Sequence, residues 1–254
     1  MLKTRIIPTL LWKDLGLVKG VGFDSWRRVG TVLPAIKVYN RRNVDELVLL
    51  DITATADGRE PDYESVAEFC QESFVPMAVG GGIRSLAHIQ GLLRAGADKV
   101  VINTAAYSHP ELITQAAQRY GSQCVVVSID VLLQPEGTYL CKSHAAQQNT
   151  AYTPVEWAKT VEALGAGEIL LTSIVRDGTM AGYDLDLLQQ VSAAVSIPVI
   201  AAGGAGTPEH CLQALTAGGS SAIAAASLFH FTEQTPLEIK QYLHSQGIPV
   251  RLTQ

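Results

Sequence analysis

Two glycine clusters in the sequence have the composition of anion-binding loops. They are Val79-Gly-Gly-Gly-Ile-Arg-Ser85 and Ala201-Ala-Gly-Gly-Ala-Gly-Thr207, and each follows a short apolar run. A strand, a glycine-rich turn and the start of a helix expose backbone N–H groups, and glycine lets a phosphate approach without a Cβ in the way. The next apolar runs end in Asn103-Thr104 and Ala226-Ser227, which could complete each site. We therefore predict two phosphate sites for one long ligand; the alternative is that the glycines serve tight turns alone.

The residues predicted for each phosphate site follow from these patterns. The first phosphate site is predicted to contain Gly82, Asn103 and Thr104, and the second Gly204, Ala226 and Ser227 together with Asp177-Gly178, a dipeptide that could equally be a turn.

Polar side chains at the ends of other apolar runs could take part in proton transfer and substrate binding. Asp130 is the candidate acid or base, although an aspartate at a strand end also serves as a helix cap. Asp51 and Thr172 occupy similar positions and are predicted to contact substrate. Lys19 lies in the stretch 12–30, whose length predicts a lid loop; it would help to hold an anionic substrate, or be solvated.

Charged residues begin four of the apolar runs. Arg5, Glu46, Lys99 and Glu168 share the alternating face of their runs with apolar residues further along. If that face points into a barrel, they form a charged ring at its bottom. The alternative is four separate solvated charges at strand starts.

The elements that position these residues are eight short apolar runs separated by amphipathic stretches. Helices are predicted at 85–95 and 154–164, among others. Near-continuous apolar strands linked by helices indicate a parallel sheet covered on both faces. Eight such units in 254 residues favour a single-domain (βα)8 TIM barrel over residues 1–254. The runs are 5–11, 46–51, 76–79, 99–103, 124–130, 168–172, 198–202 and 221–226.

An internal repeat supports this fold. The glycine clusters, the segments around Gly96 and Gly218, and the runs that begin at Glu46 and Glu168 are each separated by 122 residues. A constant offset near half the chain predicts two similar (βα)4 halves.

Composition narrows the function classes. The formal net charge of −5 disfavours a nucleic-acid partner, and no run is long enough to span a membrane. Four scattered cysteines suggest a reducing, cytoplasmic location, and their spacing with the six histidines predicts no metal site. The glycine clusters lack the dinucleotide-binding pattern, so we expect no cofactor.

Several motifs together resemble the cyclase subunit family of imidazole glycerol phosphate synthase, over essentially the whole chain. They include Arg5-Ile-Ile-Pro8, Leu50-Asp-Ile-Thr53, Val79-Gly-Gly-Gly-Ile-Arg84, Ile102-Asn-Thr-Ala105, Arg176-Asp-Gly-Thr179, Gly203-Gly-Ala-Gly206 and Ser227-Leu-Phe-His230. The resemblance implies a lyase-type cyclisation of a bis-phosphate ribonucleotide in histidine biosynthesis. It also implies a glutaminase partner at the barrel bottom, where Asp98 would pair with it. Ammonia would pass a gate formed by Arg5, Glu46, Lys99 and Glu168 and travel through the barrel interior.

One departure from the family affects the expected chemistry. The family uses two aspartates as acid and base; Asp130 matches the second, whereas Leu11 occupies the place of the first. Trp12, Leu15 and Ala202 differ nearby. Two functions therefore stay open: the cyclase subunit itself, or a paralogue without cyclase activity that passes ammonia to a separate sugar amidotransferase in surface-polysaccharide (lipopolysaccharide) biosynthesis.

Overall fold

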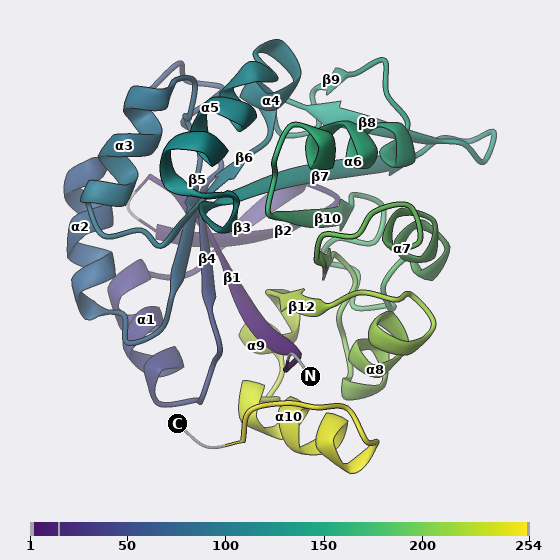
Figure 1. Ribbon diagram of the computed structural model, residues 1–254. Coiled ribbons are helices and arrows are strands. Elements are labelled where there is room, and N and C mark those ends of the chain that lie inside the picture. The colour runs from purple at the N-terminus through teal and green to yellow at the C-terminus, as the bar shows by residue number, and fades with distance from the viewer. Residues whose placement is uncertain (1–2, 15, 253–254) are drawn as a thin grey trace.

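A closed barrel of parallel strands forms the centre of the computed structural model, which describes residues 3–14 and 16–252 (Figure 1). Within these residues eight parallel strands make up the barrel; β12 pairs with β1 and β7 pairs with β10, which closes the sheet. The predicted (βα)8 barrel is confirmed. The strands are β1 (Arg5–Lys13), β4 (Leu47–Asp51), β5 (Met77–Gly80), β6 (Lys99–Ile102), β7 (Val125–Leu133), β10 (Glu168–Ser173), β11 (Val199–Ala202) and β12 (Ala222–Ala225).

Helices surround the barrel (Figure 1). The helices predicted at 85–95 and 154–164 are α3 and α6, each slightly shorter than predicted. None of the helices in the described part of the chain is long and apolar enough to cross a membrane. The longer helices are α1 (Val32–Asn40), α2 (Tyr63–Glu72), α3 (Leu86–Arg94), α5 (Glu111–Tyr120), α6 (Pro154–Ala163), α7 (Leu185–Ser192), α8 (Pro208–Thr216) and α10 (Pro236–Ser245); the short ones are α4 (Thr104–Ser108), α9 (Ser227–Phe231) and the 3₁₀ helix η1 (Ser122–Cys124).

The two halves of the barrel repeat the same elements. Helices α3 and α8 are 122 residues apart at both ends, and so are strands β5 and β11. The short helices α4 and α9 follow β6 and β12 in the same way. Each half also has an antiparallel extension of its first strand, formed by β2 (Gly16–Val21) and β3 (Asp24–Gly30) after β1, and by β8 (Tyr139–Ser143) and β9 (Gln148–Asn149) after β7. The repeat predicted from the offset is therefore present in the fold.

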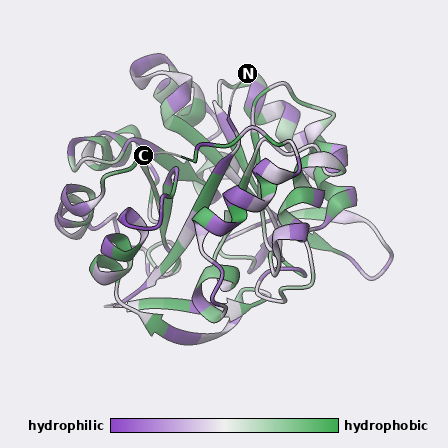
Figure 2. Ribbon diagram, turned by 90° about the horizontal axis from the view of Figure 1, so that it is seen from below, coloured by the Kyte–Doolittle hydropathy of each residue, from purple (hydrophilic) through white to green (hydrophobic). Residues whose placement is uncertain are grey.

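The barrel interior is a core of its own. Residues alternate along each strand, so that Ile7 points inward whereas its neighbour Ile6 packs under the helices. The barrel strands are mostly green in Figure 2, while the helices around them carry purple segments. The inner core consists of Ile7, Val48, Ala78, Val101, Val126, Leu170, Ile200, Ala222 and Ala224.

The stretch 12–30, which was predicted to be a long loop, forms a β-hairpin, and its role as a lid stays a prediction. Strand β1 continues to Lys13 and pairs with β2, which pairs with β3. Gly22 and Phe23 connect β2 to β3 with φ values of +61° and +64°. Two successive positive φ values are typical of a type I′ turn, whose twist suits a hairpin. The length of the stretch could not reveal this, because the hairpin depends on glycines: a Cβ on Gly20 would lie 2.0 Å from the carbonyl oxygen of Asp24.

Candidate active site

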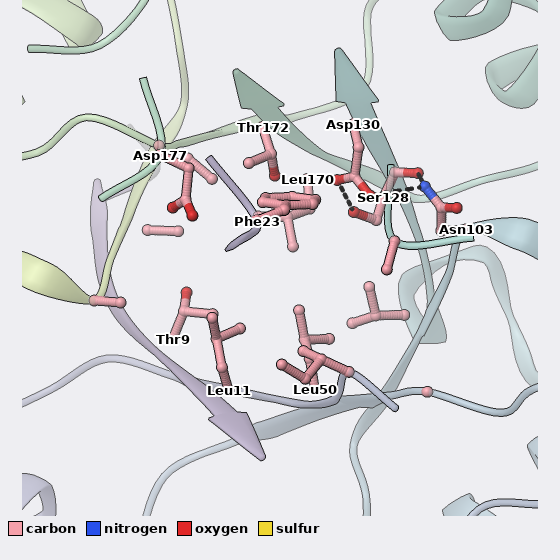
Figure 3. A pocket seen from close by; sticks show the side chains of 18 of the residues that line it. Thr9, Leu11, Phe23, Leu50, Asn103, Ser128, Asp130, Leu170, Thr172 and Asp177 are labelled. Carbon is pink, nitrogen blue, oxygen red and sulfur yellow. Dashed lines mark hydrogen bonds between the residues drawn. The ribbon is translucent and has the colours of Figure 1, made fainter. Parts of the chain in front are cut away.

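A pocket opens at the carboxyl ends of the barrel strands (Figure 3). Asp130 and Thr172 lie on one wall, Leu11 and Leu50 lie on the opposite wall, and Phe23 of the hairpin lies between them. The glycine loops after β5 and β11 line the pocket as well. The pocket therefore brings together the predicted acid or base and both predicted phosphate sites.

Asp130 is the buried carboxyl group of this pocket. One carboxylate oxygen accepts a hydrogen bond from the Asn103 amide at 3.2 Å, and the other accepts from the Ser128 hydroxyl at 3.2 Å. Burial raises the pKa of Asp130 to about 7, and the charge of Asp177 adds to the rise, although bonds from Ser128 and Thr172 oppose it. A carboxyl group with this pKa can hold or release a proton near neutral pH.

The opposite wall is apolar where the resemblance leads one to expect a second acid. Leu11 pairs in register with Leu50 of β4, and both side chains line the pocket. Among the described residues, β1 contributes no carboxylate to this pocket. Leu15, another departure from the family, lies outside the described residues.

Asp51 lines the pocket, but its carboxylate is engaged by its own loop. One oxygen accepts from the N–H groups of Thr53 and Ala54 at 3.0 and 2.9 Å, and the other pairs with Arg59 at 3.1 Å. Asp51 therefore organises the β4–α2 loop beside the pocket, which limits its use as a replacement for the missing acid.

The first predicted phosphate site lies after β5 and β6. Gly82, Asn103 and Thr104 all line the pocket. The φ of Gly82 is +68°, and a Cβ there would lie 2.8 Å from the Arg59 carbonyl oxygen, so glycine is required. The Thr104 hydroxyl accepts from the His144 N–H at 3.0 Å, and the Asn103 amide bonds to Asp130. A ligand at this site would therefore rely mainly on backbone N–H groups.

The second predicted site lies after β11 and β12. Gly204, Ala226, Ser227 and Gly178 line this side of the pocket. The Ser227 hydroxyl is buried and has no hydrogen-bond partner among the described residues. A buried hydroxyl without a partner costs free energy, so its position favours a ligand oxygen there.

Lys19 is buried, and the prediction that it could be a solvated loop lysine was wrong. Its side chain is 2% exposed, and Nζ donates to both carboxylate oxygens of Asp177 at 2.8 and 2.7 Å. The Gly22 N–H also donates to the Asp177 carbonyl oxygen. Burial, together with the Lys19 charge, lowers the pKa of the neighbouring His230 to about 4. The ion pair holds the hairpin against the β10–α7 loop at the edge of the pocket.

The charged residues at the strand starts do form a ring at the amino-terminal end of the barrel. Arg5 contacts Glu46 at 2.6 Å and Glu168 at 2.9 Å, and Lys99 contacts the same two carboxylates at 2.9 and 3.0 Å. Each cation therefore bridges both anions. Glu46 is the most buried member, with its side chain 3% exposed. The alternative of four separate solvated charges is wrong.

Asp98 lies at the same end of the molecule, immediately before β6. The residue is exposed, and one carboxylate oxygen accepts the Met77 N–H at 2.8 Å. Asp98 and Phe74, whose side chain is 84% exposed, line one shallow depression. Both side chains are accessible from solvent at this end of the barrel.

Sequence reasoning missed several residues of the site. Ser128 shares the inward face with Asp130, so alternation could have identified it. Phe23 reaches the pocket only through the hairpin turn and left no signal in the strand pattern. His88 and His210 contact the glycine loops and are separated by the same 122 residues as the loops themselves, so the repeat could have revealed them.

Comparison with known proteins agrees with this geometry. The family model described as "Histidine biosynthesis protein" matches residues 5–235. The chain is 49% identical to the imidazole glycerol phosphate synthase subunit HisF of Chlorobium luteolum over 252 residues, which is 99% of this chain and all of that protein. It is 47% identical, with the same coverage, to the subunit of the same name from Chlorobaculum tepidum. The fold, the pocket and these similarities agree, and the chain belongs to the histidine biosynthesis protein family.

Proposed function

We propose that this chain is the ammonia-accepting barrel subunit of a glutamine amidotransferase complex. The observation that carries the proposal is the ion-pair ring of Arg5, Glu46, Lys99 and Glu168, which covers one end of an apolar barrel whose other end opens on Asp130. Apolar residues of similar volume often stabilise a fold at least as well as buried ion pairs do, so stability alone does not explain these charges. A role as a gate accounts for charges in this position.

The barrel interior suits a small neutral molecule. The apolar side chains of the inner core lie between the ion-pair ring and the pocket. Ammonia can enter such a region without a charge, whereas ammonium would lose its hydration. A glutaminase docked at the ring would release ammonia there, and Asp98 with the exposed Phe74 would contribute to the docking surface.

The two glycine loops support a substrate with a phosphate at each end. They lie in the same pocket, and the unpartnered Ser227 hydroxyl adds a donor to the second site. The relatives named imidazole glycerol phosphate synthase subunit HisF support the cyclase reaction of histidine biosynthesis as the activity. In that reaction Asp130 would supply one proton-transfer group at the pocket.

Leu11 favours a second candidate function. The cyclase reaction needs one group to take a proton and another to give one, and Leu11 can do neither. The chain would then serve as a conduit that keeps the ring and the docking surface and passes ammonia to a separate sugar amidotransferase.

Two measurements test these proposals. The first is complex formation with a glutaminase, measured by sedimentation and by glutaminase activity with and without the chain. If the two proteins do not associate, the ammonia-accepting role is wrong both for the cyclase subunit and for the conduit. The second is turnover of the bis-phosphate ribonucleotide by the chain alone in saturating ammonium salt. Robust turnover would exclude the conduit, and negligible turnover together with glutaminase association would favour it.

A further inference from the structure

The two glycine loops are each tied to the following helix by a histidine side chain. The Arg84 N–H donates to Nδ1 of His88 at 3.2 Å, and the Gly206 N–H donates to Nδ1 of His210 at 3.2 Å. His88 and His210 occupy the same position in α3 and α8, three residues after the N-cap residue. In each helix the histidine N–H also donates to the N-cap hydroxyl, of Ser85 and Thr207, at 3.3 Å. One residue thus caps the helix with its main chain and holds the loop with its ring.

The histidine bonds lie where each loop leaves the pocket. Gly82 and Ile83 line the pocket in the first loop, as do Gly204 and Ala205 in the second. The next N–H in each loop, of Arg84 and Gly206, bonds to the imidazole. Each ring therefore fixes the peptide that follows the pocket-lining residues. This matters because glycine backbones have more conformations to lose than any others.

Both histidines contact their loop through Nδ1. Nδ1 of His88 lies 3.2 Å from the Arg84 N–H nitrogen, and Nε2 of the same imidazole lies 3.6 Å from the Glu60 carboxylate. The Gly82 carbonyl oxygen lies 3.2 Å from the same Nδ1. His210 has the simpler environment, with the Gly206 N–H on Nδ1 and Gly182 packed against the ring. The Gly182 N–H in turn donates to the Gly204 carbonyl oxygen at 2.8 Å, which fixes the second loop from another side.

We infer that His88 and His210 are positioning residues that hold the first and the second glycine loop, respectively, in the shape that binds a phosphate group. The inference rests on the proposed bis-phosphate substrate. It assigns one histidine to each phosphate group, so loss of one imidazole should weaken phosphate binding at its own loop alone. If each histidine only stabilised the start of its helix, its replacement would lower the melting temperature and leave the phosphate affinity unchanged.

The substitutions that separate these roles are asparagine and leucine at each position. The side-chain oxygen of asparagine lies as many bonds from the backbone as Nδ1 and can accept the loop N–H, whereas leucine cannot. His244→Leu, at an exposed position in the last turn of α10, is the control. The probe is inorganic phosphate, titrated into the full chain while the amide NMR signals of Gly82, Ile83, Gly204 and Ala205 report each loop separately.

We expect His210→Leu to raise the phosphate Kd at the second loop about five- to tenfold, as the loss of one hydrogen bond implies, with no change at the first loop. His88→Leu should do the reverse, and the asparagine variants should stay within about twofold of the parent chain. Amide hydrogen exchange at Gly206 should be faster in His210→Leu than in His210→Asn, a comparison that needs no ligand. Where leucine prevents folding, glutamine replaces it, because its acceptor lies one bond too far out.

The outcomes distinguish this inference from the proposed function. If the parent chain shows phosphate shifts at both loops and the leucine variants keep its affinities, the positioning role is wrong and the bis-phosphate proposal stands. Equal weakening at both loops by either variant would also overturn the positioning role. If the parent chain shows no shift at either loop, both the phosphate sites and the role of the histidines are wrong.

Discussion

Leu11 of β1 faces Asp130 of β7 across the pocket at the carboxyl end of the barrel (Figure 3). The first is an apolar side chain in register with Leu50, and the second is a buried carboxyl group whose pKa is raised to about 7. Some reactions need a proton donor and a proton acceptor on opposite walls of a pocket. Of this pair of positions, Asp130 can transfer a proton and Leu11 cannot.

Leu11→Asp should restore the missing group. We expect negligible ammonia-dependent cyclase turnover by the parent chain in saturating ammonium salt, and a measurable rise in the variant, because one acid or base group contributes about 10² to 10⁴ in rate. Product formation from the bis-phosphate ribonucleotide checks this. Leu11→Asn is the matched control, since it has the same size and polarity without a titratable group. An equal rise in Leu11→Asn would show that polarity, not proton transfer, was missing.

Asp130→Asn should change how stability depends on pH. The pKa of Asp130 is raised in the folded state, so the folded state binds a proton more tightly than the unfolded state between about pH 4 and pH 7. The stability that this carboxyl group contributes is complete below pH 4 and is lost as the pH rises to about 7. The asparagine variant has no such loss.

The variant should therefore gain stability relative to the parent chain from pH 4 to pH 7, by on the order of 2–4 kcal/mol, and the difference should level off above pH 7. Urea unfolding at pH 4.5, 6 and 8 measures it. Asp62→Asn, which removes an exposed carboxylate at the N-cap of α2, is the surface control. A difference between variant and parent that does not change with pH would mean that Asp130 is ionised throughout this range.

These residues also show where sequence reasoning succeeds and where it ends. Alternation along the strands was enough to place Arg5, Glu46, Lys99 and Glu168 on one inward face, because a strand has a strict period of two. It could not place Lys19, since the partner, Asp177, is 158 residues away and the hairpin between Trp12 and Gly30 depends on a turn with two positive φ values. The raised pKa of Asp130 likewise depends on burial by several strands at once, which no local pattern contains.

The ion-pair ring should contribute more to stability than an exposed ion pair. Glu46→Gln leaves Arg5 and Lys99 with Glu168 as their shared carboxylate, in a site where Glu46 is almost fully buried. We expect a loss of about 1–3 kcal/mol in the free energy of unfolding, measured with urea. The control is Glu72→Gln, which breaks the exposed pair with Lys37 and should cost less than about 1 kcal/mol. Equal losses in the two variants would mean that the ring is screened by solvent like any surface pair.

The docking surface at the same end of the barrel gives the last prediction. Asp98→Lys should weaken association with a glutaminase by reversing a charge at the contact, but it also removes the acceptor for the Met77 N–H. Asp98→Asn separates the two effects, because the amide oxygen can still accept that bond while the charge is gone. If the charge itself pairs with the partner, Asp98→Asn should weaken binding about three- to tenfold with an unchanged melting temperature, and added salt should reduce the difference between variant and parent.

Phe74→Ala, which removes the exposed aromatic side chain from the same depression, should weaken binding without this dependence on salt. Titration calorimetry at two salt concentrations measures the affinity of all three variants. Parent-like affinity in both Asp98→Lys and Phe74→Ala would mean that the glutaminase docks elsewhere on the barrel.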